Sequence, residues 1–271
     1  MRELLKRTIT GILYIFLLLA AVYLSNDAFD FLFLIFGLTC LYEFKKIIRL
    51  RGYFIFIAFL LLWWVCIYLL GSFAQHFLVS IILLGCCVVV DLIMILKLFS
   101  TTPAQYTNTQ KFLISLFYIG GGCIFLTMIP YRNEHFAKTL IIGIFILIWV
   151  NDSFAYLVGK SIGRTKLFER VSPKKTVEGF VGGLVFSLIA AYFLYKYGSE
   201  LSLAQWLILA IVVVVSGSLG DLVESKFKRL AGVKDSGAIL PGHGGLLDRL
   251  DSLVFAAPFT FLTLQIFNYV S

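Results

Sequence analysis

The run between Asp221 and Asp251 gathers residue types that together bind metal ions and phosphates. Its cations are Lys226, Lys228, Arg229 and Lys234, a glycine-rich turn follows at 241–245, and Asp248, Arg249 and Asp251 close the run. Carboxylates hold a divalent cation, bases hold phosphates, and glycines let backbone N–H groups approach an anion. The run therefore predicts phosphoryl or nucleotidyl transfer. A solvated basic loop would account for the lysines, but not for the spaced aspartates and the glycine turn.

Helical spacing groups the acidic residues of this run on two faces. Four polar residues at i, i+3, i+4 and i+7 share one face: Asp221, Glu224, Ser225 and Lys228. Asp248 and Asp251, at i and i+3, share another at the mouth of the last apolar span. If the loop between them folds back, Asp221 and Asp248 can face one another across a divalent cation. Mg²⁺ takes one or two protein carboxylates plus phosphate oxygens and water, so the pattern predicts a magnesium site.

A second basic segment precedes another predicted span. Ser172, Pro173, Lys174, Lys175 and Thr176 stand directly before a helix that opens near Glu178. Proline restricts the chain, and Ser or Thr can cap the helix that follows. Adjacent lysines at a helix N-terminus make an anion site, so we expect phosphate binding here.

Two further carboxylates lie in or near apolar segments. Asp152, beside Asn151 and Ser153, ends a span and either lines a cytoplasmic vestibule or marks the membrane boundary; we favour the vestibule. Asp91 lies well inside a span, where a lone carboxylate is costly. It is either functional or a structural hydrogen-bonding residue. The five cysteines lie in apolar segments without metal-ligand spacing and are expected to be small buried hydrophobes.

Composition excludes an ordinary soluble domain, because 60% of the residues are hydrophobic and the mean hydropathy is +0.96. A hydrocarbon core of roughly 30 Å needs about 20 residues of helix. Nine stretches approach that length: 8–25, 28–43, 53–71, 77–97, 112–130, 139–158, 179–198, 203–222 and 253–270. The fold class is therefore all-α, a polytopic integral membrane protein with about nine transmembrane helices.

The distribution of positive charge predicts the orientation. With the N-terminus in the cytoplasm, all but three of the 23 Lys and Arg fall on the cytoplasmic side, the exceptions being Arg132, Lys138 and Lys196. An odd number of spans then puts the C-terminus outside. The net charge of +8 indicates topology and affinity for anionic lipid headgroups, and no nucleic acid is implied.

Polar chemistry divides the chain into two regions of one membrane domain. Residues 1–150 carry aromatic-rich spans and short basic loops, and are expected to be a scaffold or a lipid-facing wall. Residues 151–271 carry the clustered polar residues and are expected to be the catalytic region with its cytoplasmic loops.

These motifs closely resemble those of the phosphatidate cytidylyltransferase family, also called CDP-diacylglycerol synthases. The family signature is met without a gap from Ser225 through Lys228-Arg229, Lys234-Asp235, Gly237, Leu240-Pro241, His243-Gly244-Gly245 and Asp248-Arg249 to Asp251. The upstream element, Ser172 to Gly179, also matches, except that Val177 stands where Trp is common. The resemblance is sharp over 151–252 and rests only on hydropathy over 1–150.

The resemblance implies that CTP and phosphatidate give CDP-diacylglycerol and pyrophosphate, with Mg²⁺ as cofactor. It implies metal ligation by Asp221 and Asp248, with Asp251 and Glu224 as further candidates. Catalytic roles fall to Asp221, Asp248, Lys228, Arg229, Lys234 and Arg249. Substrate binding falls to Ser172, Lys174, Lys175, Thr176, Asp152, Ser225, Asp235, His243, Gly244 and Gly245. The partners would be CTP, phosphatidate, the bilayer and, in a homodimer, a second copy of the chain. In a prokaryote the site would face the cytoplasm from the cell membrane.

Two rival functions are weighed against this one. A membrane CTP-dependent polyprenol or phytol kinase would transfer the γ-phosphoryl group to an alcohol and release CDP. An anion transporter would place its site near the midplane on broken helices, often in repeated halves. Here the midplane offers only Asp91 and the halves do not match, so we favour a transferase.

Overall fold

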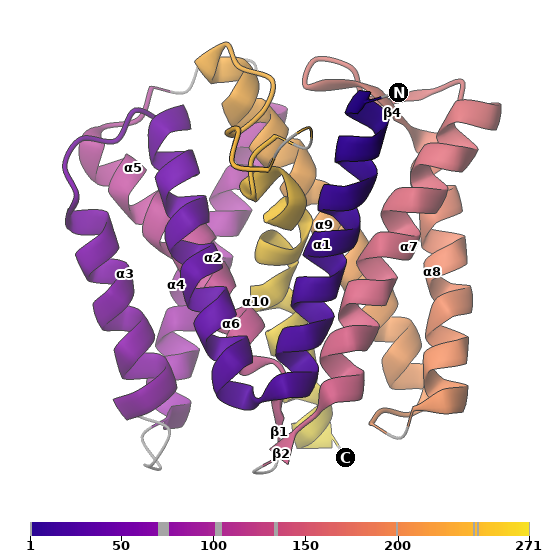
Figure 1. The fold of residues 1–271 in the computed structure, drawn as a ribbon, viewed down its shortest axis with the longest axis horizontal. Coiled ribbons are helices and arrows are strands. Elements are labelled where there is room, and N and C mark those ends of the chain that lie inside the picture. Colours follow the sequence, from indigo (N-terminus) through magenta and orange to yellow (C-terminus); the bar gives the residue numbers. More distant parts are fainter. Residues whose placement is uncertain are drawn as a thin grey trace.

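The computed structural model describes residues 2–69, 76–100, 105–132, 135–198, 200–240, 242 and 244–270. Within these ranges the chain forms a bundle of helices that run roughly side by side (Figure 1). The first group is α1 (Arg2–Leu24), α2 (Asn26–Ile47), α3 (Phe54–Trp64) with the π-helix η1 (Val65–Leu69), and α4 (His76–Phe99). The last group is α7 (Lys138–Ile162), α8 (Val177–Tyr197), α9 (Leu203–Ala231) and α10 (Leu247–Val270).

Between these groups the chain forms a single helical rod whose winding changes along its length. It begins as α5 (Asn108–Ile114), continues as the π-helix η2 (Ser115–Gly121) and ends as α6 (Gly122–Met128). Two short antiparallel hairpins complete the fold: β1 (Tyr131–Arg132) with β2 (His135–Phe136), and β3 (Lys166–Phe168) with β4 (Ser172–Thr176).

The all-α membrane fold is confirmed. Six helices in the described ranges are long and apolar enough to cross a bilayer: Leu78–Phe99, Asn108–Met128, Lys138–Ile162, Val177–Tyr197, Leu203–Ala231 and Leu247–Tyr269. Ile9–Leu24 and Phe54–Leu69 are shorter apolar helices, and α2 buries the charged residues Asp30 and Glu43. The count of nine spans therefore stays a prediction.

Polar side chains fix several helix starts. Thr107 and Ser202 form capping boxes with Gln110 and Gln205, and Ser25 accepts a hydrogen bond from the Ala28 N–H group at 3.0 Å. At the other end of α9, Gly232 adopts a φ of 72°, the left-handed conformation that commonly stops a helix at glycine.

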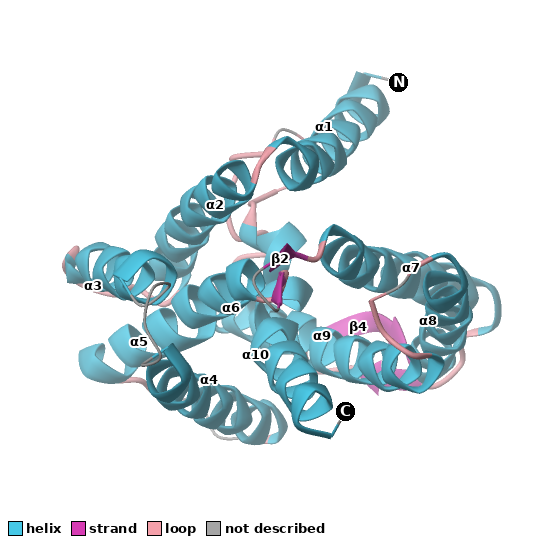
Figure 2. Cartoon of the chain, turned by 90° about the horizontal axis from the view of Figure 1, so that it is seen from below, coloured by secondary structure: helices cyan, strands magenta, loops and turns pink. Residues whose placement is uncertain are grey.

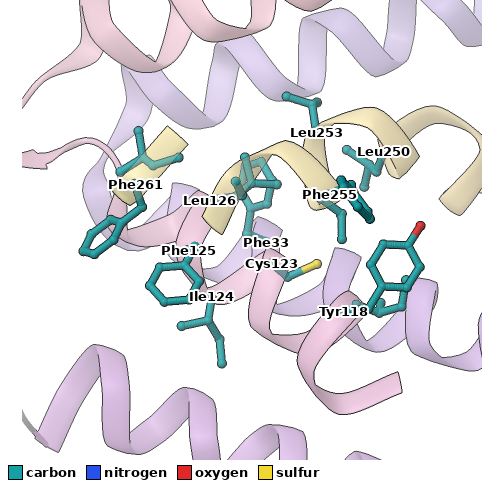
Figure 3. Packing of buried hydrophobic residues seen from close by; sticks show 14 of the residues in the cluster. Phe33, Tyr118, Cys123, Ile124, Phe125, Leu126, Leu250, Leu253, Phe255 and Phe261 are labelled. Carbon is teal, nitrogen blue, oxygen red and sulfur yellow. The ribbon is translucent and has the colours of Figure 1, made fainter. Parts of the chain in front are cut away.

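Small residues bring α9 against α10. A Cβ atom on Gly220 would lie 2.4 Å from Cβ of Phe255. The aromatic side chains of this region fill the core next to that contact (Figure 3): Tyr118 packs on Phe255 with ring centroids 5.7 Å apart, and Phe125 on Phe261 at 4.9 Å. Four of the cysteines are buried and Cys86 is half-buried, so the prediction for cysteine is confirmed.

Different segments of the chain lie at the two ends of the bundle. The N-terminus, the β3–β4 hairpin and the loop between α9 and α10 gather at one end, and the C-terminus lies at the other (Figure 1). Seen along the bundle, α6 and α10 lie near its centre (Figure 2). The predicted site segments therefore share one end of the molecule.

Candidate active site

Asp221 and Lys175 meet although they belong to separate elements. Asp221 lies on α9 and Lys175 on β4, and their side chains form an ion pair in which each is 30% exposed. The Ser225 hydroxyl, one helical turn beyond, donates to Oδ1 of Asp221 at 3.2 Å. The hairpin thus places a lysine of the basic segment 172–176 next to a predicted metal ligand.

Asp248 forms an ion pair with Lys228. Its Oδ1 accepts a hydrogen bond from Nζ of Lys228 at 2.7 Å, and Lys228 also pairs with the buried Glu224. The backbone N–H groups of Ser236 and Gly245 donate to Oδ2 of Asp248 at 2.9 and 2.7 Å. Asp248 therefore joins α9, the loop and the start of α10.

Two more predicted residues border these pairs. The Asp152 carboxylate, exposed on α7, accepts from Nδ2 of Asn151 at 3.3 Å and has Asp221, Lys175 and Arg249 as electrostatic neighbours. Asp251 is buried and has Asp221 and Lys228 among its neighbours. That Asp152 lines a cytoplasmic vestibule stays a prediction.

Other predicted residues lie around this cluster. The Arg229 side chain donates from Nε to the Val171 carbonyl at 3.4 Å. Lys174, Lys234, Asp235 and Arg249 are exposed, and Ser172 begins β4 half-buried. Thr176 caps α8 by accepting from the Gly179 N–H at 3.1 Å, which is the capping role expected of this segment.

The glycine turn has the geometry that its sequence demands. Gly244 adopts a φ of 85°, a left-handed conformation that favours glycine, and its backbone bridges that of Leu240. Gly245 is buried and turns its N–H group toward Asp248. His243 lies outside the residues that the structure describes, so its predicted role stays a prediction.

Sequence reasoning missed Glu43. This buried carboxylate on α2 accepts hydrogen bonds from the Leu247 N–H at 2.8 Å, the Leu246 N–H at 3.2 Å and the Ser236 hydroxyl at 3.2 Å. It lies in the aromatic-rich region and belongs to no recognised motif. Its only sequence signal is a charge within an apolar span, the same signal that singled out Asp91.

A lysine near the site supports the end of helix α4. Lys226 donates to the carbonyls of Lys97, Leu98 and Ser100 at the end of α4, so its charge meets the negative end of a helix. Asp91 lies earlier on α4. It is buried, and its Oδ1 has no hydrogen-bond partner among the described residues. That burial agrees with either prediction for Asp91.

The donor set is compatible with magnesium. No group of three or more His, Cys, Asp or Glu side chains in the described ranges is arranged as a metal site. Mg²⁺ needs fewer, because it takes one or two carboxylates together with phosphate oxygens and water. Asp221 and Asp248 supply hard oxygen ligands, and each is paired with a lysine whose charge a dication could replace.

Comparison with known proteins decides the family. The model of the cytidylyltransferase family matches residues 5–267. The chain belongs to the cytidylyltransferase family. The prediction that it is a nucleotidyltransferase is thereby confirmed at the level of the family.

Individual relatives have consistent names. The chain is 36% identical over 276 residues to a phosphatidate cytidylyltransferase of Bacillus subtilis (strain 168), and this match covers 99% of the chain and 100% of that protein. It is 47% identical over 148 residues to the phosphatidate cytidylyltransferase of Staphylococcus saprophyticus, where the match covers 54% of the chain and 55% of the relative. The family match, unlike the sharp motifs, thus extends through the N-terminal region.

Proposed function

We propose that this cytidylyltransferase family member transfers the cytidylyl group of CTP to phosphatidate and releases pyrophosphate. The relatives' names support the substrates. One structural observation supports the chemistry: each of the two predicted metal ligands is paired with a predicted phosphate-binding lysine, Asp221 with Lys175 and Asp248 with Lys228. Carboxylate and ammonium are thus already side by side where a metal–triphosphate complex needs both.

The reaction follows from these groups. An oxygen of the phosphatidate phosphate attacks the α-phosphorus of CTP. The bond between the α-phosphorus and the oxygen that joins it to the β-phosphorus breaks, and the β- and γ-phosphates leave together as pyrophosphate. Asp221 and Asp248, with Asp251 and Glu224 as further candidates, would hold Mg²⁺, which would supply charge neutralisation. Lys175 and Lys228 turn from carboxylate to phosphate oxygens as the substrates enter, and so stabilise the developing negative charge. A phosphate nucleophile needs no strong general base.

The place of the site suits a lipid substrate. The Lys175–Asp221 and Lys228–Asp248 pairs lie on the hairpin and helix ends that gather at one end of the bundle (Figure 1). We place this end at the cytoplasmic face of a bacterial cell membrane, because CTP is cytoplasmic and the basic loops lie there. The acyl chains can then stay in the lipid while the headgroup reacts. A homodimer stays a prediction.

Product analysis tests this proposal. Purified protein in detergent is incubated with CTP labelled in the base, Mg²⁺ and phosphatidate. We expect labelled CDP-diacylglycerol and one pyrophosphate per turnover, and we expect EDTA to stop the reaction until Mg²⁺ is restored. Release of labelled CDP with phosphorylation of an added polyprenol would instead establish the kinase alternative.

A further inference from the structure

Glu43 ties the N-terminal region of the chain to the loop that carries the site. It lies on α2, is 1% exposed, and its donors in the described residues are two backbone N–H groups and one hydroxyl, all neutral. The N–H groups belong to Leu246 and Leu247 at the start of α10. The positive end of that helix therefore stabilises the Glu43 carboxylate, as helix N-termini do for anions.

Asp248 also accepts hydrogen bonds from this loop, which connects α9 to α10. Ser236 donates its hydroxyl to Glu43 and its backbone N–H to Asp248. Likewise Gly245 donates to Asp248, while the next two N–H groups donate to Glu43. Two carboxylates from distant parts of the chain thus hold one short segment between them, and a shift at Glu43 must move the groups that orient Asp248.

Two glycines show how closely the loop fits around Glu43. A Cβ atom on Gly237 would lie 2.3 Å from Oε1 of Glu43. A Cβ atom on Gly245 would lie 2.0 Å from Oγ of Ser236 and 2.6 Å from Oε2 of Glu43. Any larger residue at either position would displace the carboxylate or the loop. These glycines are therefore explained by the close approach of the loop to Glu43.

We propose that Glu43 is a positioning residue of the transferase site: it fixes residues 236–237 and 245–247 of the loop so that Asp248 and Lys228 have the geometry that catalysis needs. It touches neither substrate nor reacting atoms. This inference rests on the proposed function for its kinetic readout. Its effect on the loop can be measured without any activity.

The test compares Glu43→Gln with a matched control on the same helix, Asp30→Asn. Asp30 is also buried, but at the far end of α2, where its carboxylate accepts from the Tyr131 hydroxyl at 2.9 Å. Gln keeps the shape of Glu43 but turns one acceptor into a donor facing the N–H groups of α10. Removing such a supporting group typically costs about 10- to 100-fold in activity or metal affinity.

We expect Glu43→Gln to lower kcat by about 10- to 100-fold and to raise the Mg²⁺ concentration for half-maximal rate. We expect its helices to unfold at nearly the temperature of the wild type. Amide hydrogen exchange of residues 235–247 should accelerate in Glu43→Gln and stay unchanged in Asp30→Asn. Asp30→Asn should also keep its kcat.

The outcomes test the positioning role of Glu43 separately from the proposed transferase function. Unchanged exchange and unchanged kcat in Glu43→Gln would overturn the positioning role. Equal losses in both variants would also overturn it, since a general structural role would then explain them. If the wild type makes no CDP-diacylglycerol, the proposed function fails, yet the exchange comparison still tests the loop. If Glu43→Gln does not fold, Gly237→Ala provides the same test by pressing a methyl group against Oε1.

Discussion

At the residue scale, the proposed reaction requires two lysines to exchange partners. Lys175 and Lys228 each neutralise a carboxylate that is predicted to bind the metal. Under the proposed function a dication and a triphosphate would enter together, the cation binding the carboxylates and the lysines binding the phosphates. The cost of separating each ion pair is then offset by an equivalent interaction with the substrate complex.

The first prediction concerns Asp221. Asp221→Asn keeps the shape of the side chain but removes the charge that attracts both Lys175 and the metal. We expect turnover to fall by at least about 100-fold, since charge stabilisation at the reacting phosphates is usually the largest contribution. Initial rates measured against Mg²⁺ concentration check this. Glu169→Gln, an exposed change in the β3–β4 turn, should leave the rate unchanged. A near-normal rate for Asp221→Asn would refute the metal assignment.

The second prediction concerns Lys175. Lys175→Met removes the ammonium but keeps an apolar side chain of similar length. We expect KM for CTP to rise and kcat to fall, because Lys175 is inferred to bind a phosphate of the nucleotide in the transition state as well as the ground state. Steady-state kinetics check this, with Lys166→Met on the neighbouring strand as control. Unchanged constants for Lys175→Met would show that its pairing with Asp221 is only structural.

The sequence predicted which residues share a helix in the site, but it did not predict which residues from distant elements pair with them. Spacing placed Asp221, Ser225 and Lys228 on one face of a helix, and the structure has all three on α9. The pairing of Lys175 with Asp221 depends on how the hairpin folds over α9, which no local pattern specifies. Glu43 was missed for the same reason, because its partners lie about 200 residues away in the sequence.

At the element scale, close helix packing depends on a few glycines. Gly122 begins α6, and a Cβ atom there would lie 2.3 Å from the Val254 carbonyl oxygen of α10. Helices in membranes gain little from apolar contact alone, so close backbone approach matters more than in water. The contact holds α10, whose first turn carries Asp248, against the central rod.

The third prediction follows from this contact. Gly122→Ala should destabilise the fold by about 1–3 kcal/mol, the usual cost of forcing an extra methyl group into a packed interface. Thermal unfolding in detergent, followed by circular dichroism, measures the effect. Gly85→Ala on α4 is the matched control: nothing lies within 4 Å of its added Cβ atom, so its stability should not fall. Equal stability of the two variants would contradict the inferred packing.

Hydropathy predicted the positions of the helices in the sequence, but it did not predict which segments are π-helix or hairpin. Apolar length is enough to locate a span, and each predicted stretch coincides with helix in the described ranges. It does not indicate the π-helix η2 within the central rod or the β3–β4 hairpin. Both depend on contacts with other elements.

At the scale of the whole molecule, the two regions of the chain are interdependent. The 151–271 region supplies the charged pairs, and the 1–150 region supplies α2 with Glu43 and the rod against which α10 packs. The N-terminal region is therefore more than a lipid-facing wall. This agrees with a family match that extends over residues 5–267.

The last prediction concerns orientation. Single cysteines are placed at two exposed positions, Val233→Cys in the loop after α9 and Lys196→Cys near the end of α8. These positions lie toward opposite ends of the bundle, because α8 runs away from the β3–β4 hairpin while α9 runs back toward the site (Figure 1). If the site faces the cytoplasm, a membrane-impermeant maleimide added to intact cells labels only Lys196→Cys, and Val233→Cys reacts after lysis. The unaltered chain gives the background, which should be low because four of its cysteines are buried and Cys86 is half-buried. Labelling of Val233→Cys in intact cells would place the charged pairs on the outer face, where no CTP is available, and both the orientation and the proposed reaction would then be wrong.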